Sequence, residues 1–167
     1  MTSIEPDRRF LTESLPQLQD YLLSAELYWP LGASLPRLTI GAVLLALARL
    51  GATQPQEAGR LETQVEAVHA KWRAAWEQKS ARETANRLRL WTQFLADYRN
   101  APEQHADSYP QEVRGRAILQ LLRADQVSET DVFLKSRLVP GGFIWDADLE
   151  SAFPKADFWF LYGKLKE

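Results

Sequence analysis

The sequence predicts an all-α protein: a single-domain helical bundle of about five helices with one long central helix. Three observations favour this class. Apolar residues recur at steps of three and four along several segments, Ser-Leu-Pro or similar start signals precede some of them, and proline or glycine follows others. The chain has 167 residues, enough for one domain, 1–167, with a sizeable core.

The first two helices are predicted over residues 14–29 and 36–50. Ser14 and Pro16 suit a helix start, because proline lacks only a donor that the first turn cannot use. The Ser-Leu-Pro signal recurs before the second segment, whose apolar residues lie on every side of a helical wheel. This pattern is typical of a helix that is surrounded by others.

A long helix is predicted over residues 56–99, which contain no proline and only one glycine, Gly59. A single helix of this length would extend about 66 Å, whereas a compact domain of this size is about 40 Å across. The helix must therefore protrude, bend or divide. Ser80 and Glu83 match a capping box, which favours a division near residue 80. Against a division, residues 77–87 contain no glycine, proline or aspartate to make a loop. We therefore expect one long, kinked helix rather than two.

Two shorter helices are predicted over 109–124 and 129–137, after a polar linker. Residues 140–167 form an aromatic-rich tail in which Phe158 to Tyr162 run without a polar break. This run is too short for periodicity to distinguish strand from helix. We expect the tail to be irregular and to pack over the helices as an aromatic clasp.

Composition limits the classes of function. The absence of cysteine excludes disulfides, zinc–thiolate sites and thiol nucleophiles. A formal net charge of −2 provides no global field toward nucleic acid or anionic lipid. The most apolar stretch, 38–50, is shorter than the roughly 20 residues of a membrane-spanning helix. With no signal peptide at the amino terminus, these features lead us to expect a cytoplasmic protein without a membrane segment.

Local motifs for chemistry are weak. Glu66 and His69 have the spacing of a helical metal pair, but helix-bundle carboxylate sites need this device twice, with further glutamates. Acidic residues and a histidine alternate over 103–107, and carboxylates alternate over 146–150. Hydrated linkers and helix caps account for both patterns. We therefore predict no catalytic residue, no metal site and no cofactor.

The leading functional hypothesis is a non-catalytic protein-interaction or scaffold domain. It would self-associate as a homodimer through the long helix, where Ala81 and Ala85 permit close helix approach, or bind another protein. Tryptophan and tyrosine are enriched at binding hot spots. The candidate partner- or ligand-binding residues are Trp29, Trp145, Asp146, Trp159 and Tyr162.

Two other functions are considered. The alternative is a small-molecule-binding or enzymatic bundle, whose pocket would be formed near the tail by Trp145, Trp159 and Tyr162 with the carboxylate of Asp146. The third is nucleic-acid binding through the basic face of residues 79–99, with Trp91 and Phe94 as stacking surfaces. Basic and aromatic residues are largely segregated along the chain, which places nucleic acid last.

Overall fold

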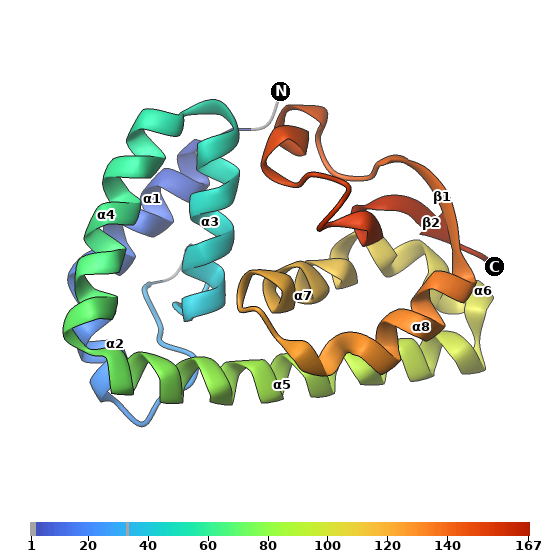
Figure 1. The fold of residues 1–167 in the computed structure, drawn as a ribbon, viewed down its shortest axis with the longest axis horizontal. Helices are drawn as coiled ribbons and strands as arrows, with labels where there is room; N and C mark the ends of the chain where they lie inside the picture. Colours follow the sequence, from blue (N-terminus) through green and yellow to red (C-terminus); the bar gives the residue numbers. More distant parts are fainter. Residues whose placement is uncertain (1–2, 33) are drawn as a thin grey trace. The chain divides into compact units, whose positions relative to one another are not determined.

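A computed structural model describes residues 3–32 and 34–167 and confirms the all-α class with an irregular C-terminal segment (Figure 1). The chain forms two compact units, Met1–Glu83 and Thr84–Glu167. The boundary between them lies inside helix α5 (Arg73–Asn100), the longest helix of the described residues. The prediction that the whole chain is a single domain stays a prediction.

The N-terminal unit contains α1 (Glu5–Ser14), α2 (Leu18–Leu23), α3 (Ile40–Thr53), α4 (Pro55–Lys71) and the first part of α5. The helix predicted over 14–29 is wrong at both ends. Helical structure begins nine residues earlier, where proline and two carboxylates occupy the first turn of α1. A 3₁₀ turn joins α1 to α2, which ends before an extended Ser24.

Helix α3 begins at Ile40 rather than at residue 36. Thr39 has extended backbone angles, and its hydroxyl accepts a hydrogen bond from the Ala42 N–H at 2.9 Å. Leu38 is held in an antiparallel bridge with Trp29, so the residues just before the cap cannot be helical. As its apolar pattern predicts, α3 is largely buried, and it packs against α1 and α4.

The segment predicted as a long helix over 56–99 is divided, and the division falls at Trp72 rather than near Ser80. Trp72 has φ −120° and ψ 44°, and α4 and α5 meet there at an angle (Figure 1). The ring of His69 stacks on that of Trp76 at 4.2 Å between centroids, with 14° between their planes. This stack joins α4 to α5 across the break, while Ser80 and Glu83 lie within α5.

The C-terminal unit contains the rest of α5, the short α6 (Pro102–His105), α7 (Tyr109–Leu121) and α8 (Ser128–Arg137). The predicted linker therefore includes a helical turn. Helix α7 ends three residues earlier than predicted. Arg123, just after it, has φ +58°, a left-handed conformation that helical residues do not adopt.

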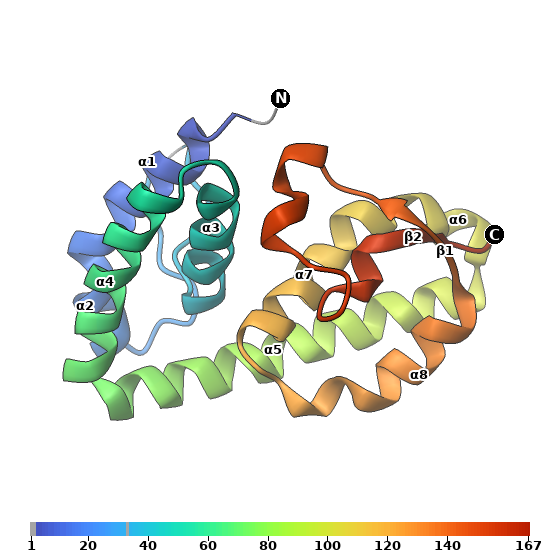
Figure 2. The ribbon, with the colours of Figure 1, turned by 45° about the horizontal axis from the view of Figure 1, so that its top comes forward.

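The aromatic tail contains two short antiparallel strands, β1 (Leu138–Phe143) and β2 (Tyr162–Leu165), which Figure 2 shows paired. The aromatic run from Phe158 to Tyr162 therefore contains both structures: Trp159–Leu161 form a 3₁₀ turn, and Tyr162 begins β2. Gly163 has φ +147°, and a Cβ atom there would lie 2.3 Å from the Val139 carbonyl oxygen. Only glycine fits at this position.

Candidate functional site

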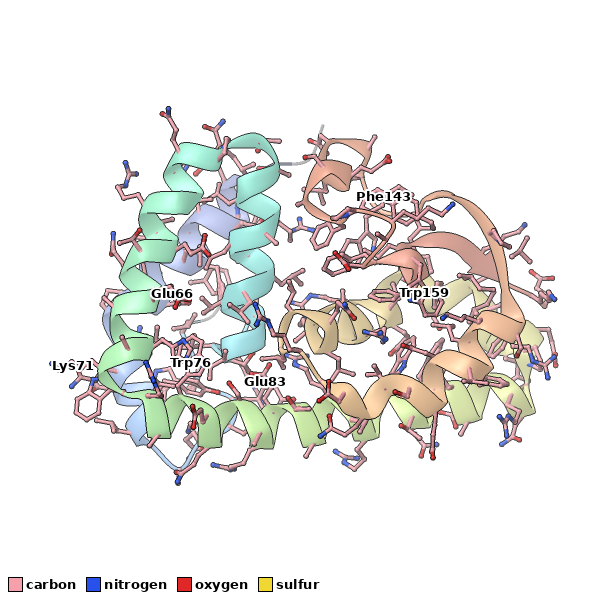
Figure 3. The ribbon with its side chains drawn as sticks, in the orientation of Figure 1. Glu66, Lys71, Trp76, Glu83, Phe143 and Trp159 are labelled. Atoms are coloured by element: carbon pink, nitrogen blue, oxygen red, sulfur yellow. The ribbon has the colours of Figure 1, made fainter. Side chains whose placement is uncertain are left out.

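Two ionisable side chains of α5 are buried in the N-terminal unit. Lys79 is 3% exposed, its Nζ donates hydrogen bonds to the carbonyl oxygens of Ser24 (2.8 Å) and Glu26, and burial lowers its pKa. Glu83, labelled in Figure 3, is fully buried and accepts a hydrogen bond from the Gly41 N–H in the first turn of α3 at 2.9 Å. These bonds hold backbone in place, and we assign both groups a structural role.

Tyrosine hydroxyls hold the tail in the C-terminal unit. Tyr98 of α5 donates to the Lys166 carbonyl, Tyr109 of α7 to the Phe160 carbonyl, and Tyr162 to the Phe153 carbonyl. Burial raises the pKa of all three tyrosines. The bonds from Tyr98 and Tyr109 therefore attach the tail to the helices, whereas the bond from Tyr162 to Phe153 lies within the tail.

One buried ion pair connects α7 to α8. Arg116 is 2% exposed and binds Asp131 through two hydrogen bonds of 2.9 and 2.8 Å, and its Nη1 donates to Gln120. Its guanidinium carbon also lies 4.3 Å from the ring centroid of Phe160. Every one of these contacts is internal to the unit, so Arg116 too is structural.

Of the predicted site residues, Trp29 lies in the N-terminal unit, apart from the other four along the chain. It is half-buried, and its indole N–H donates to Gln17 Oε1 at 2.8 Å. Its ring also contacts that of Tyr21 edge-on. Trp29 thus anchors the irregular segment after α2. Whether it also contacts a partner stays a prediction.

The other four predicted residues lie in the C-terminal unit and do not form a single group. The rings of Trp145 and Tyr162 both contact Phe143, with centroids 6.3 and 5.4 Å away. Trp159, labelled in Figure 3, lies instead against Phe160, and the Lys135 ammonium is 4.9 Å from the centroid of its ring. Asp146 is exposed. The hydroxyl of Tyr162 and the indole N–H of Trp145 donate hydrogen bonds to backbone carbonyls of the same unit, so neither hydrogen is free to bind a ligand.

The described residues hold no group of three or more histidine, aspartate or glutamate side chains placed to bind a metal ion. His69 lies 3.6 Å from the carboxylate of Glu66, and its ring is used in the stack on Trp76. None of the helices formed by residues 3–32 and 34–167 is long and apolar enough to cross a membrane.

The basic face predicted over 79–99 is smaller in the structure than in the sequence. Lys79 is buried, and so are the rings of Trp91 (2% exposed) and Phe94 (7%). These rings therefore offer no open face on which a base could stack. Arg82, Arg89 and Arg99 remain exposed.

A groove of about 400 Å³ lies between α5 and α8 in the C-terminal unit. Its walls combine apolar and polar side chains: Thr92, Leu95, Ala96, Arg99, Asn100, Glu129, Thr130 and Phe133. Val132, beside Phe133 on α8, is 73% exposed. No local pattern in the sequence indicates this groove, because its two walls come from helices some 30 residues apart along the chain.

The ring of Phe133 organises one part of the groove. The guanidinium carbon of Arg99 lies 4.3 Å from its centroid, and that of Arg137 lies 5.4 Å away. The ring of Tyr98 contacts Phe133 edge-on. Two cations therefore share one aromatic ring, an arrangement that neither helix reveals in the sequence by itself.

No family model, curated protein or solved structure matches this chain.

Proposed function

We propose that this protein is a non-catalytic protein-interaction domain that binds a partner in the groove between α5 and α8. The groove itself is the observation that carries the proposal. Its volume is about 400 Å³, and its lining combines the apolar Leu95, Ala96 and Phe133 with polar side chains. A groove between two helices is a common docking place for a partner helix.

The buried ionisable groups support a non-catalytic role. Lys79, Glu83 and Arg116 form hydrogen bonds to backbone or to structural partners. None of them lines the groove. A catalytic group would need to reach a substrate, so the groove is suited to recognition rather than to reaction.

Site-specific photocrosslinking in cells tests the proposal. A photoreactive residue replaces Ala96, which lines the groove, or Ala74, which is exposed at the start of α5. We expect a discrete crosslinked product from position 96 and none from position 74. Thr130→Trp, which fills the groove, should remove the product. Equal products from both positions, or a product that Thr130→Trp leaves unchanged, would contradict the proposal.

Self-association through α5 is the second part of the proposal. Ala81 and Ala85 are exposed one turn apart on the same face of α5, so they allow the backbone of another helix to approach. Arg82 and Arg89 are exposed beside them, and two copies would bring these like charges together. Because salt screens exposed charges, we expect a dimer that strengthens as ionic strength rises.

Sedimentation at micromolar concentration, in low and in high salt, measures this dimer. Ala85→Trp should shift the mass toward the monomer, whereas Ala74→Trp serves as the matched control on the same helix. A monomeric mass at both salt concentrations would refute self-association. That result would not bear on the binding of a different partner in the α5–α8 groove, which the crosslinking experiment tests separately.

A further inference from the structure

Charge is distributed unevenly along the groove between α5 and α8. Glu129 lies near the start of α8, and Arg137 is its last residue, so the two are separated by about 12 Å along the helix axis. Arg99 from α5 joins Arg137 at the ring of Phe133. Glu129 and Arg99 both line the groove, together with Leu95, Ala96 and Phe133. Arg137 is outside this lining but lies beside it at the ring of Phe133, and we call Arg99, Phe133 and Arg137 the basic end of the groove.

The two guanidinium groups keep their hydrogen-bond donors available. Among residues 3–32 and 34–167, no carboxylate or carbonyl oxygen accepts a hydrogen bond from the side chain of Arg99 or of Arg137. Both residues lie in the last turn of their helices, where the helix dipole favours a cation. The dipole explains why the charges are tolerated, but it satisfies none of the N–H groups.

Stacking on Phe133 prepares these donors for an anion. A guanidinium that rests on an aromatic ring keeps its edge free, and its planar fork matches the geometry of a carboxylate or phosphate. Because the ring restricts both side chains beforehand, less conformational entropy is lost when an anion binds. By contrast, Arg116, the buried arginine of this unit, uses its fork on Asp131.

We propose that the basic end of the groove binds a carboxylate carried by an amphipathic helix of a partner protein. The carboxylate would pair with Arg99 and Arg137, and an apolar side chain one turn away would pack against Leu95 and Phe133. This inference rests on the proposed interaction function and adds the chemistry of the partner. Charge complementarity at the two arginines selects an acidic partner, and the apolar surface beside them selects a protein.

Glu129 argues against a polyanion as the occupant. A nucleic-acid strand that follows the groove would place further phosphates near this carboxylate, where like charges repel. A helix with a single acidic residue can place that carboxylate at the two arginines and an apolar residue four positions later against Leu95 and Phe133, without bringing a second negative charge to Glu129. Residues at that spacing lie on one face, about 5–6 Å apart.

Fluorescence anisotropy with two labelled helical peptides tests the inference on the full chain. One peptide carries Glu four residues before Leu, so that both side chains lie on the same face of its helix. The matched control peptide carries Gln in place of Glu. At low salt we expect the Glu peptide to bind at least tenfold more tightly than the Gln peptide, because a charge-assisted bond is replaced by a neutral one. The preference should shrink at about 0.5 M salt.

Variants assign the preference to the arginines. The double substitution of Arg99→Gln and Arg137→Gln should abolish the tenfold preference, and Arg73→Gln, at an exposed arginine of α5 outside both the groove lining and the proposed dimer face, should preserve it. Thermal unfolding of each variant confirms that it folds. The two peptides could bind the unchanged protein equally, and Thr130→Trp could weaken both. That result would overturn the selectivity for an acidic partner but would still support an interaction function for the groove.

Two further results would overturn the inference. One is a preference for the Glu peptide that persists in the double variant, because the carboxylate would then be bound elsewhere. The other is that single-stranded DNA binds the protein more tightly than the Glu peptide does and that the Thr130→Trp variant loses this binding. That result would identify a phosphate ligand instead.

Discussion

The two units hold their irregular segments to the helices by different chemistry. In the N-terminal unit, the start of the loop after α2, at Ser24 and Glu26, is fixed by a buried ammonium, Lys79, and the start of α3 by a buried carboxylate, Glu83. In the C-terminal unit, the aromatic tail is attached to the helices by the neutral hydroxyls of Tyr98 and Tyr109, and the hydroxyl of Tyr162 makes a bond within the tail. In both cases the bonds described end on backbone groups.

The comparison shows how charge changes the consequence of losing a bond. A hydrogen bond to a charged group is roughly twice as strong as a neutral one, but the charge is costly to bury. The loop therefore depends on a few strong bonds, whereas the tail shares its attachment among several weaker bonds and a large apolar surface. We expect single substitutions to disturb the loop more than the tail.

Replacing the buried ammonium should have the largest effect. Lys79→Met keeps the length of the side chain but removes the charge-assisted bond to the half-buried Ser24, while water can replace the donor at the exposed Glu26. The free energy of unfolding should fall by about 2–3 kcal/mol. Chemical denaturation measures the change. Arg82→Met, at an exposed neighbour with one bond of 3.2 Å, is the control and should cost about 0.5 kcal/mol or less. Equal losses in the two variants would contradict the role of Lys79.

Loss of one neutral bond from the tail should be milder. Tyr109→Phe leaves the buried Phe160 carbonyl without its donor, and we expect a loss of about 1–2 kcal/mol in the same assay. A loss as large as that of Lys79→Met would remove the distinction between the two modes of attachment.

Tyr98→Phe should have a still smaller effect, about 0.5–1 kcal/mol, although the same chemical group is removed. Its acceptor is the carbonyl of Lys166, an exposed residue, so water can replace the hydroxyl there. Amide hydrogen exchange in β2 would measure the local loosening. No change in exchange would show that the strand is held without this bond.

Alkaline pH should weaken the tail gradually. The pKa of each of the three tyrosines is raised by burial, so the native state keeps protons that the unfolded chain releases above about pH 10. Stability should therefore be unaffected by these groups below that pH and fall as the pH rises above it. Denaturant titrations at about pH 9 and about pH 11 measure the slope, which Tyr109→Phe should reduce. An identical slope in the variant would contradict the assignment.

The sequence predicted the fold class because helical spacing of apolar residues reflects burial directly. The boundaries were less accessible. Lys71, Trp72 and Arg73 include no helix-breaking residue. Apolar residues also recur at helical spacing before and after them, so nothing local marks the division at Trp72. The stack of His69 on Trp76 across the break depends on tertiary structure, which periodicity does not encode.

Glu83 shows why a correct local signal can be misread. Its spacing from Ser80 matched a capping box, and the structure does use its carboxylate at a helix start. That start belongs to α3, more than 40 residues earlier in the sequence, and not to the helix that contains Glu83. A motif search sees only neighbours along the chain, so it assigned the cap to the wrong helix.

The groove between α5 and α8 was inaccessible for a related reason. Arg99 and Arg137 each fit the preference for a cation at a helix end, and Phe133 was one apolar residue of a short helix. Only the packing of the two helices places both cations on one ring. The predicted site residues were chosen as types enriched at binding hot spots, with one carboxylate, and Trp145 instead uses its indole N–H to attach the tail to α7.

The crowded glycine of the hairpin has an evolutionary consequence. Since any side chain at Gly163 would strike the Val139 carbonyl, descendants of this fold should retain glycine there even where most other positions have diverged. A pattern that joins this glycine to a preceding tyrosine and to the distant Tyr109 would be a compact signature. It could recognise remote relatives whose overall similarity has been erased.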